Sequence, residues 1–228
     1  MRTVLGFSEY NFVFQNSTQT HCEVDNFAPS ISAAIGSFIP QKYVWQAAIS
    51  LHIMPRFVFL LMYKNFYQSR ISNITQRVQW LIQLAIGFNL LELFSLLGLT
   101  LVSSLENFDI HKICFATFGI SGLIYFILTY LLWTQCGLTL ETNEEIYSLK
   151  VKKSMLKVYF VCGCLMSYFY YRHNEYCEPY VYSFFCICEY LIVFANMFFH
   201  FTAKYDFANT NLIIPSRTSP KGYLPLTR

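Results

Sequence analysis

Five apolar runs alternate with polar segments along the chain, and each is long enough to cross the roughly 30 Å hydrocarbon core of a bilayer as a helix. They cover residues 43–63, 79–102, 113–133, 155–171 and 180–201. A transmembrane strand would alternate apolar and polar residues with a period of two, and none of the runs does so. Because lipid admits only helices and closed barrels, the pattern predicts an all-α fold, a polytopic transmembrane helical bundle with five spans.

The polar segments at the two ends define the expected organisation around this bundle. Residues 1–40 have no sustained apolar core and are expected to form an exoplasmic, lumenal N-terminal segment. Residues 41–207 contain the bundle. Residues 208–228 carry three prolines and few apolar side chains, so we expect a flexible cytosolic tail.

Composition excludes several classes of protein. Only 13% of the 228 residues are charged, about half the share of a soluble domain. Aromatic residues make up 19%, and the mean hydropathy is +0.38. These values argue against a cytosolic enzyme, a disordered chain and a nucleic-acid binder, and they favour membrane lipids as the surroundings. The net charge of +3 says little by itself, because the placement of charge matters more in a membrane protein.

The positions of Lys and Arg predict the orientation. Eleven of them lie in the segments after the first and third spans and after the last span. These are Lys64, Arg70, Arg77, Lys150, Lys152, Lys153, Lys157, Lys204, Arg217, Lys221 and Arg228. Four lie on the opposite side, namely Arg2, Lys42, Lys112 and Arg172. The positive-inside rule therefore places the N-terminus in the lumen and the C-terminus in the cytosol.

Polar side chains interrupt three of the spans at similar depths. A rise of about 1.5 Å per residue puts them about 14–20 Å from the exoplasmic boundary. They are His52, Arg56, Asn89, Glu92 and Glu189. An unpaired charge there would cost several kcal/mol, so we expect Arg56 to pair with Glu92 or Glu189. Two interpretations remain open: an ion-pair network that fixes helix register, or a polar floor beneath a cavity for a lipid headgroup, with His52, Arg56, Glu92 and Glu189 as substrate-binding candidates.

A second group of polar residues lies in the predicted lumenal segments. His21, His111 and His173 are three of the five histidines, and we expect them to meet on one surface. Acids accompany them, and an imidazole beside a carboxylate suits general acid–base catalysis near neutral pH. The catalytic candidates are His111, His173, Asp109, Glu175 and Glu178, and Arg172 is a candidate for binding a phosphodiester. The alternative is that these residues only seal loops onto helix ends.

The cysteines and one sequon complete the candidate chemistry. Of eight cysteines, Cys22 and Cys177 are the two in lumenal segments, where the environment is oxidising, so we expect a disulfide between them. The pairs Cys162/Cys164 and Cys186/Cys188 point to different sides of a helix, and no metal site and no cofactor are predicted. Asn16-Ser17-Thr18 is a lumenal glycosylation sequon.

Several ordered strings resemble the family of post-GPI attachment to proteins factor 2, where GPI is glycosylphosphatidylinositol. They occupy residues 21–36 (HCEVDNFAPSISAAIG), 40–45 (PQKYVW), 51–57 (LHIMPRF), 103–111 (SSLENFDIH), 172–178 (RHNEYCE) and 189–207. The resemblance spans about residues 20–208. More distant relatives are the damage-regulated autophagy modulators. The family pattern has six helices with both ends cytosolic, and because residues 1–20 are polar and short we expect five helices here, without the one that precedes the first lumenal loop.

The resemblance implies lipid remodelling of GPI anchors in the Golgi or endoplasmic reticulum. The family is required for reacylation of lyso-GPI with a saturated fatty acid, which keeps GPI-anchored proteins at the cell surface. The implied partners are the GPI lipid and an acyl donor. Two hypotheses follow, a GPI-directed acyltransferase (or an essential component of one) and a non-enzymatic membrane adaptor or lipid-presenting scaffold. A transporter is less favoured, because no inverted repeat is visible.

Overall fold

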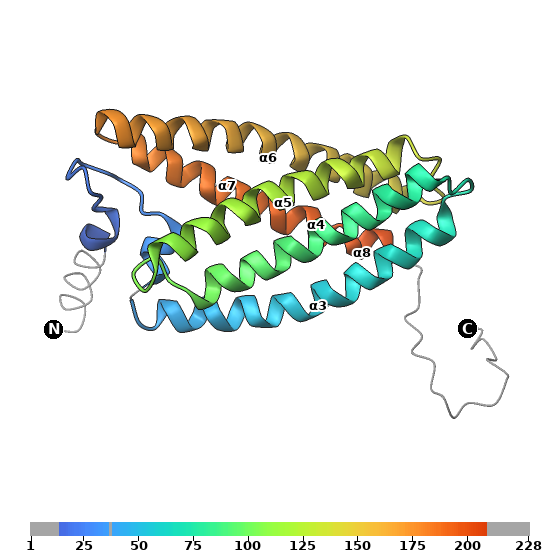
Figure 1. Ribbon diagram of the computed structural model, residues 1–228, viewed down its shortest axis with the longest axis horizontal. Coiled ribbons are helices and arrows are strands. Elements are labelled where there is room, and N and C mark those ends of the chain that lie inside the picture. The colour runs from blue at the N-terminus through green and yellow to red at the C-terminus, as the bar shows by residue number, and fades with distance from the viewer. Residues whose placement is uncertain (1–13, 37, 209–228) are drawn as a thin grey trace, which may run out of the picture.

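The computed structural model describes residues 14–36 and 38–208, and helices dominate them. Within these ranges there is no β-strand, and the long helices form one elongated antiparallel bundle (Figure 1). The helices are α2 (Ile31–Gly36), α3 (Gln41–Arg70), α4 (Gln76–Leu101), α5 (Phe108–Thr134), α6 (Asn143–Tyr176), α7 (Val181–Phe201) and α8 (Ala203–Asp206). The prediction for the tail 208–228 falls almost entirely outside the described residues.

The protein is a polytopic α-helical membrane protein, as the apolar runs predict. Among the described residues, four segments are long and apolar enough to cross a bilayer: α3, α4, α5 and the stretch Val181–Asp206. The helices extend past the predicted spans, and α3 continues to Arg70 instead of ending near residue 63. An apolar run marks only the part of a helix that lies in hydrocarbon, whereas its ends can continue among the lipid headgroups.

Helix α6 begins well before the predicted fourth span. Lys150, Lys152, Lys153 and Lys157 do not lie in a connection, because α6 begins at Asn143. Thr142 caps its N-terminus and forms a capping box with Glu145, which fixes this early start. The predicted fourth span is the central part of this 34-residue helix. The count of five spans stays a prediction, since α6 is not among the four segments named above.

The helices pack in two close pairs, α4 against α5 and α6 against α7. Within the first pair, a Cβ atom at Gly98 would lie 2.6 Å from the sulfur of Cys114, and between the pairs a Cβ atom at Gly122 of α5 would lie 2.8 Å from the hydroxyl of Tyr159 of α6. Only glycine permits such close approach, which is how small residues bring membrane helices together. Between the pairs, the rings of Phe126 and Phe199 stack with centroids 3.6 Å apart and form the centre of the core.

The two ends of the bundle differ in what they carry. The α2 end, on the left of Figure 1, contains α2 and the α4–α5 and α6–α7 connections. The α8 end contains α8 and the α3–α4 and α5–α6 connections. By the distribution of Lys and Arg the α2 end is the predicted lumenal end.

Candidate functional site

A cavity lies inside the bundle beneath α2, and side chains of α2, α3, α4, α5 and α7 form its wall. Its volume is about 240 Å³. Most of the wall is apolar, with Leu96, Leu99, Phe115, Phe118 and Val193 among the residues that form it. The polar side chains that reach it are Ser32, His52, Arg56, His111, Glu189 and Asn196. An apolar cavity with a few converging polar groups has the usual composition of a small-molecule site.

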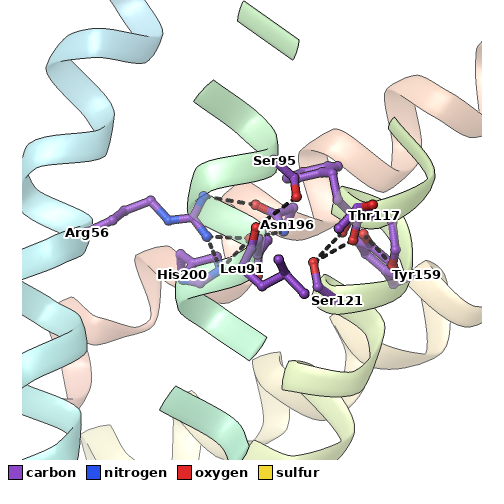
Figure 2. Close-up of polar contacts among 11 residues, drawn as sticks. Arg56, Leu91, Ser95, Thr117, Ser121, Tyr159, Asn196 and His200 are labelled. Carbon is purple, nitrogen blue, oxygen red and sulfur yellow. Dashed lines mark hydrogen bonds and ion pairs between the residues drawn. The ribbon is translucent and has the colours of Figure 1, made fainter. Parts of the chain in front are cut away.

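Arg56 is held at the cavity by a network of buried polar side chains. Its guanidinium donates to Glu92 and contacts the imidazole of His200, and it lies 3.5 Å from the Asn196 amide oxygen (Figure 2). The amide nitrogen of Asn196 donates to the same Glu92 oxygen at 2.8 Å. Arg56 is 5% exposed and Glu92 is fully buried. Of the two expected partners of Arg56, Glu92 and Glu189, it is therefore Glu92 that forms the ion pair.

Glu189 instead holds the segment that covers the cavity. Its carboxylate accepts the backbone N–H of Ile31, the first residue of α2, at 3.1 Å. The preceding residues lie along α7 in the same way. The hydroxyl of Ser183 accepts the N–H groups of Phe27 and Ala28 at 2.8 and 3.2 Å, and the Tyr190 hydroxyl donates to the carbonyl of Pro29 at 3.1 Å. Glu189 thus has both a structural partner and a place on the cavity wall.

His52 and His111 reach the cavity from α3 and α5. The Nδ1 atom of His111 lies 2.7 Å from the carbonyl oxygen of Val102. A carbonyl oxygen only accepts, so this contact requires the proton on Nδ1 and leaves Nε2 of the neutral ring as an acceptor. The Nδ1 atom of His52 is buried without a hydrogen-bond partner among the described residues. Two imidazoles with acceptor capacity therefore face one cavity.

The α4–α5 connection positions the carbonyl that orients His111. Glu106 accepts the backbone N–H of Ser103 at 2.9 Å and a bond from Lys42 of α3 at 3.1 Å. The Ser103 amide first, and then the Lys42 ammonium, hold the pKa of the Glu106 carboxyl below its ordinary value. These contacts join the connection to the start of α3 and place the carbonyl of Val102 beside His111.

The remaining catalytic candidates lie elsewhere at the α2 end. His173 is 1% exposed and packs against the rings of His21 and Tyr182, with centroids 5.4 and 5.0 Å away. Among the described residues no ring contact joins His111 to them, so only two of the three histidines predicted to be lumenal meet. Asp109 and Glu175 are exposed. None of these lines the cavity.

Arg172 and Glu178 pair with one another. The guanidinium donates to both carboxylate oxygens, and the first cause of a raised Arg172 pKa is this hydrogen bond. Neither residue is among those that form the cavity wall. A guanidinium already occupied by a carboxylate has fewer donors left for a phosphodiester.

Cys22 and Cys177 form a disulfide, with Cα atoms 5.3 Å apart. The bond joins the N-terminal segment to the end of α6, where Cys177 follows the last helical residue. The ring of His21 lies beside the two sulfurs. Because a bonded sulfur is not a thiolate, the three do not form a set of metal ligands in this state. Asn16 lies in a short helical turn and is exposed, and its glycosylation stays a prediction.

The sequence did not predict two members of the network around Arg56, and it did not predict one further buried ion pair. Asn196 and His200 follow Glu189 on α7 at intervals of seven and four residues, a spacing that puts all three on one face of the helix. Lys152, counted above as a cytosolic charge, is 1% exposed and pairs with Asp206 of α8. No sequence signal separates this buried lysine from its exposed neighbour Lys153.

The chain matches, over residues 2–210, the domain family described as the Frag1/DRAM/Sfk1/Cwh43P N-terminal domain. The chain belongs to this family. It is 41% identical over 92% of its length to the "Post-GPI attachment to proteins factor 2" of Caenorhabditis briggsae and covers 81% of that protein. The homologue from Caenorhabditis elegans, with the same name, is 41% identical over 89% of this chain and 78% of its own length.

A vertebrate relative carries a more specific name. "Acyltransferase PGAP2" of Xenopus tropicalis is 39% identical over 90% of this chain and 81% of its own length. No solved structure matches the chain.

Proposed function

We propose that this chain takes part in GPI-anchor remodelling as the acyltransferase that returns a saturated acyl chain to lyso-GPI. The names of the similar proteins supply the substrate class and the reaction class. The observation that carries the proposal is the cavity beneath α2, which combines apolar walls with two imidazoles, a carboxylate and a guanidinium. The apolar walls are suited to acyl chains, and the imidazoles, the carboxylate and the guanidinium are suited to transfer of an acyl group to a hydroxyl.

His111 is the proposed general base. With the proton on Nδ1 bonded to Val102, its Nε2 atom can accept the proton of a lyso-GPI hydroxyl as that hydroxyl attacks an ester carbonyl. Arg56 is fixed by Glu92 and provides a permanent positive charge at the cavity wall, suited to the negative oxygen that develops on the carbonyl. His52 is a second proton carrier beside it. Glu189 holds α2 as the cover that limits access of water.

The proposed setting follows from topology. With the α2 end in the lumen and residues 208–228 in the cytosol, the cavity lies in the lumenal half of the membrane, where the lipid part of a GPI anchor resides. A Golgi or endoplasmic reticulum membrane is the proposed location. Residues 1–40 are the proposed lumenal segment, of which α2 covers the cavity.

Restoration of surface GPI-anchored proteins in cells that lack the factor tests this assignment. We expect His111→Ala to lose most of the restoring activity at normal abundance, about 10²–10⁴-fold in rate if the imidazole is the base. His21→Ala removes an exposed histidine from the same end of the bundle and is the matched control, expected to restore normally. Full restoration by His111→Ala at normal expression would favour the scaffold over the enzyme.

His173 needs a separate measurement, because it is buried away from the cavity wall. We expect His173→Ala to reduce protein abundance, since the ring fills space between His21 and Tyr182. Normal abundance together with lost activity would return His173, and with it the nearby Glu175 and Glu178, to the catalytic candidates. Purified protein and lyso-GPI, with the acylated product measured by mass spectrometry, separate direct catalysis from an indirect requirement.

A further inference from the structure

The charges at the α2 end restrict the kind of acyl donor that the cavity can accept. Among the described residues this end carries three cations, Lys42, Lys112 and Arg172. It carries six acids, namely Glu23, Asp25, Glu106, Asp109, Glu175 and Glu178. This end of the bundle as a whole is therefore acidic among the described residues, unlike the α8 end.

The few cations at this end are largely neutralised by partners. Lys42 pairs with Glu106 at 3.1 Å, and Arg172 pairs with Glu178. At the cavity wall, the charge of Arg56 is matched by Glu92, which lies behind it and does not line the cavity, and Glu189 supplies a carboxyl group to the wall. In the described part of the chain only Lys112 remains at this end without an ion pair.

An acyl-coenzyme A thioester fits this environment poorly. Its pyrophosphate and ribose phosphate need several Lys or Arg side chains to bind them. At an acidic surface these groups meet charges of their own sign, which costs several kcal/mol. A zwitterionic phospholipid has no net charge and needs no such cluster.

The cavity also reaches the side of the bundle that faces lipid. Ala48 of α3 and Met197 of α7 belong to its wall and are exposed, Met197 by 49%. The two helices flank the opening, while α3 packs mainly on α4 and α7 on α6. A lipid can therefore bring an ester to His52 and His111 by lateral diffusion, without leaving its leaflet.

We infer that the acyl donor at this site is a zwitterionic phospholipid of the same leaflet and not an acyl-coenzyme A thioester. The inference rests on the proposed function and adds the second substrate to it. The lyso-GPI hydroxyl attacks the ester carbonyl of the phospholipid, a new C–O bond forms, and the C–O bond to the donor glycerol breaks. The hydroxyl proton passes through His111 to the departing alkoxide, so the products are diacyl GPI and a lysophospholipid.

This exchange needs no external source of energy. One oxygen ester is replaced by another, so the reaction is close to balanced. Because phospholipids greatly outnumber lyso-GPI in a membrane, mass action drives acylation of the anchor. No oxidant, reductant or metal takes part in the step.

The full chain in lipid nanodiscs provides the test. Both reactions contain lyso-GPI. In the first, the phosphatidylcholine carries an isotope-labelled saturated chain. In the second, the phosphatidylcholine is unlabelled and the label is on added stearoyl-coenzyme A. We expect the label to reach GPI from phosphatidylcholine at least about tenfold faster than from the thioester, a difference of about 1.4 kcal/mol in the barrier. Lysophosphatidylcholine should appear in equal amount to the acylated GPI.

The outcomes separate this inference from the proposed function. Equal or faster transfer from stearoyl-coenzyme A would overturn the inference and leave the acyltransferase intact. Transfer from neither donor by protein that is monodisperse and stable would overturn both.

A pair of variants tests the route of entry. Met197→Trp at the opening should slow transfer about tenfold or more, which corresponds to a barrier higher by about 1.4 kcal/mol. Val44→Trp, at an exposed position of α3 outside the cavity wall, should leave the rate unchanged. Unaltered transfer by a well-folded Met197→Trp protein would rule out entry between α3 and α7.

Discussion

Replacing Arg56 by leucine should destabilise the protein strongly, because it leaves Glu92 buried without its cation. Arg56 is 5% exposed and Glu92 is 0% exposed, so water cannot replace the lost partner. The second oxygen of Glu92 has no hydrogen-bond partner among the described residues, because the contacts with Arg56, Asn196 and His200 all go to the first oxygen. His200 is charged only when protonated, so Arg56 is the permanent cation of the network.

The expected cost is about 3–5 kcal/mol, the usual penalty for removing one member of a buried ion pair. For a chain of this length that corresponds to a thermal midpoint about 6–20 °C lower. The double variant Arg56→Leu/Glu92→Leu removes both charges and should recover most of this loss, because a buried pair contributes little beyond an apolar replacement of similar size. A large positive coupling between the two substitutions is thus expected.

Thermal unfolding of detergent-purified protein, monitored by size-exclusion chromatography, measures these differences in stability. Arg77→Leu removes an exposed arginine at the start of α4 and is the matched control, expected to change stability by less than about 0.5 kcal/mol. An Arg56→Leu protein with the same thermal midpoint as the wild type would contradict this prediction and would mean that Glu92 is neutral or hydrated in the bundle.

Three further predictions concern other parts of the molecule. Lys152→Met should reduce stability by about 3–5 kcal/mol, because it leaves Asp206 buried alone, whereas Lys153→Met at the exposed neighbouring position should not; thermal unfolding compares the two. Alkylation mass spectrometry of protein from the secretory pathway should find Cys22 and Cys177 bonded, and free thiols would refute the pairing. Asn16→Gln should abolish a glycosidase-sensitive shift in gel mobility, and an unshifted wild type would place Asn16 outside the lumen or leave it unmodified.

The sequence by itself determined the class of fold and the depth of the polar groups. Apolar runs reveal membrane helices because the bilayer requires about 20 consecutive apolar residues to cross it. Counting residues then gives depth, since each adds about 1.5 Å along the helix axis. That arithmetic was enough to expect Arg56, Glu92 and Glu189 at a similar level. The oxidising environment expected for lumenal segments was enough to single out Cys22 and Cys177 as a disulfide pair.

Only the tertiary structure decided which of these groups meet. The direction in which a side chain points depends on the rotation and tilt of its helix, and these are fixed by packing at contacts such as Gly98–Cys114 and Phe126–Phe199. Packing brings Glu92 to Arg56 and turns Glu189 toward the first residue of α2.

Packing also separated residues that the sequence treats alike. His111 and His173 both lie near helix ends at the predicted lumenal end, yet one lines the cavity and the other is enclosed beside a disulfide. Lys152 and Lys153 are adjacent, yet only Lys152 faces the bundle, because successive residues of a helix point about 100° apart. The sequence determines which charges exist and how deep they lie, and the packing of the helices determines which of them find a partner.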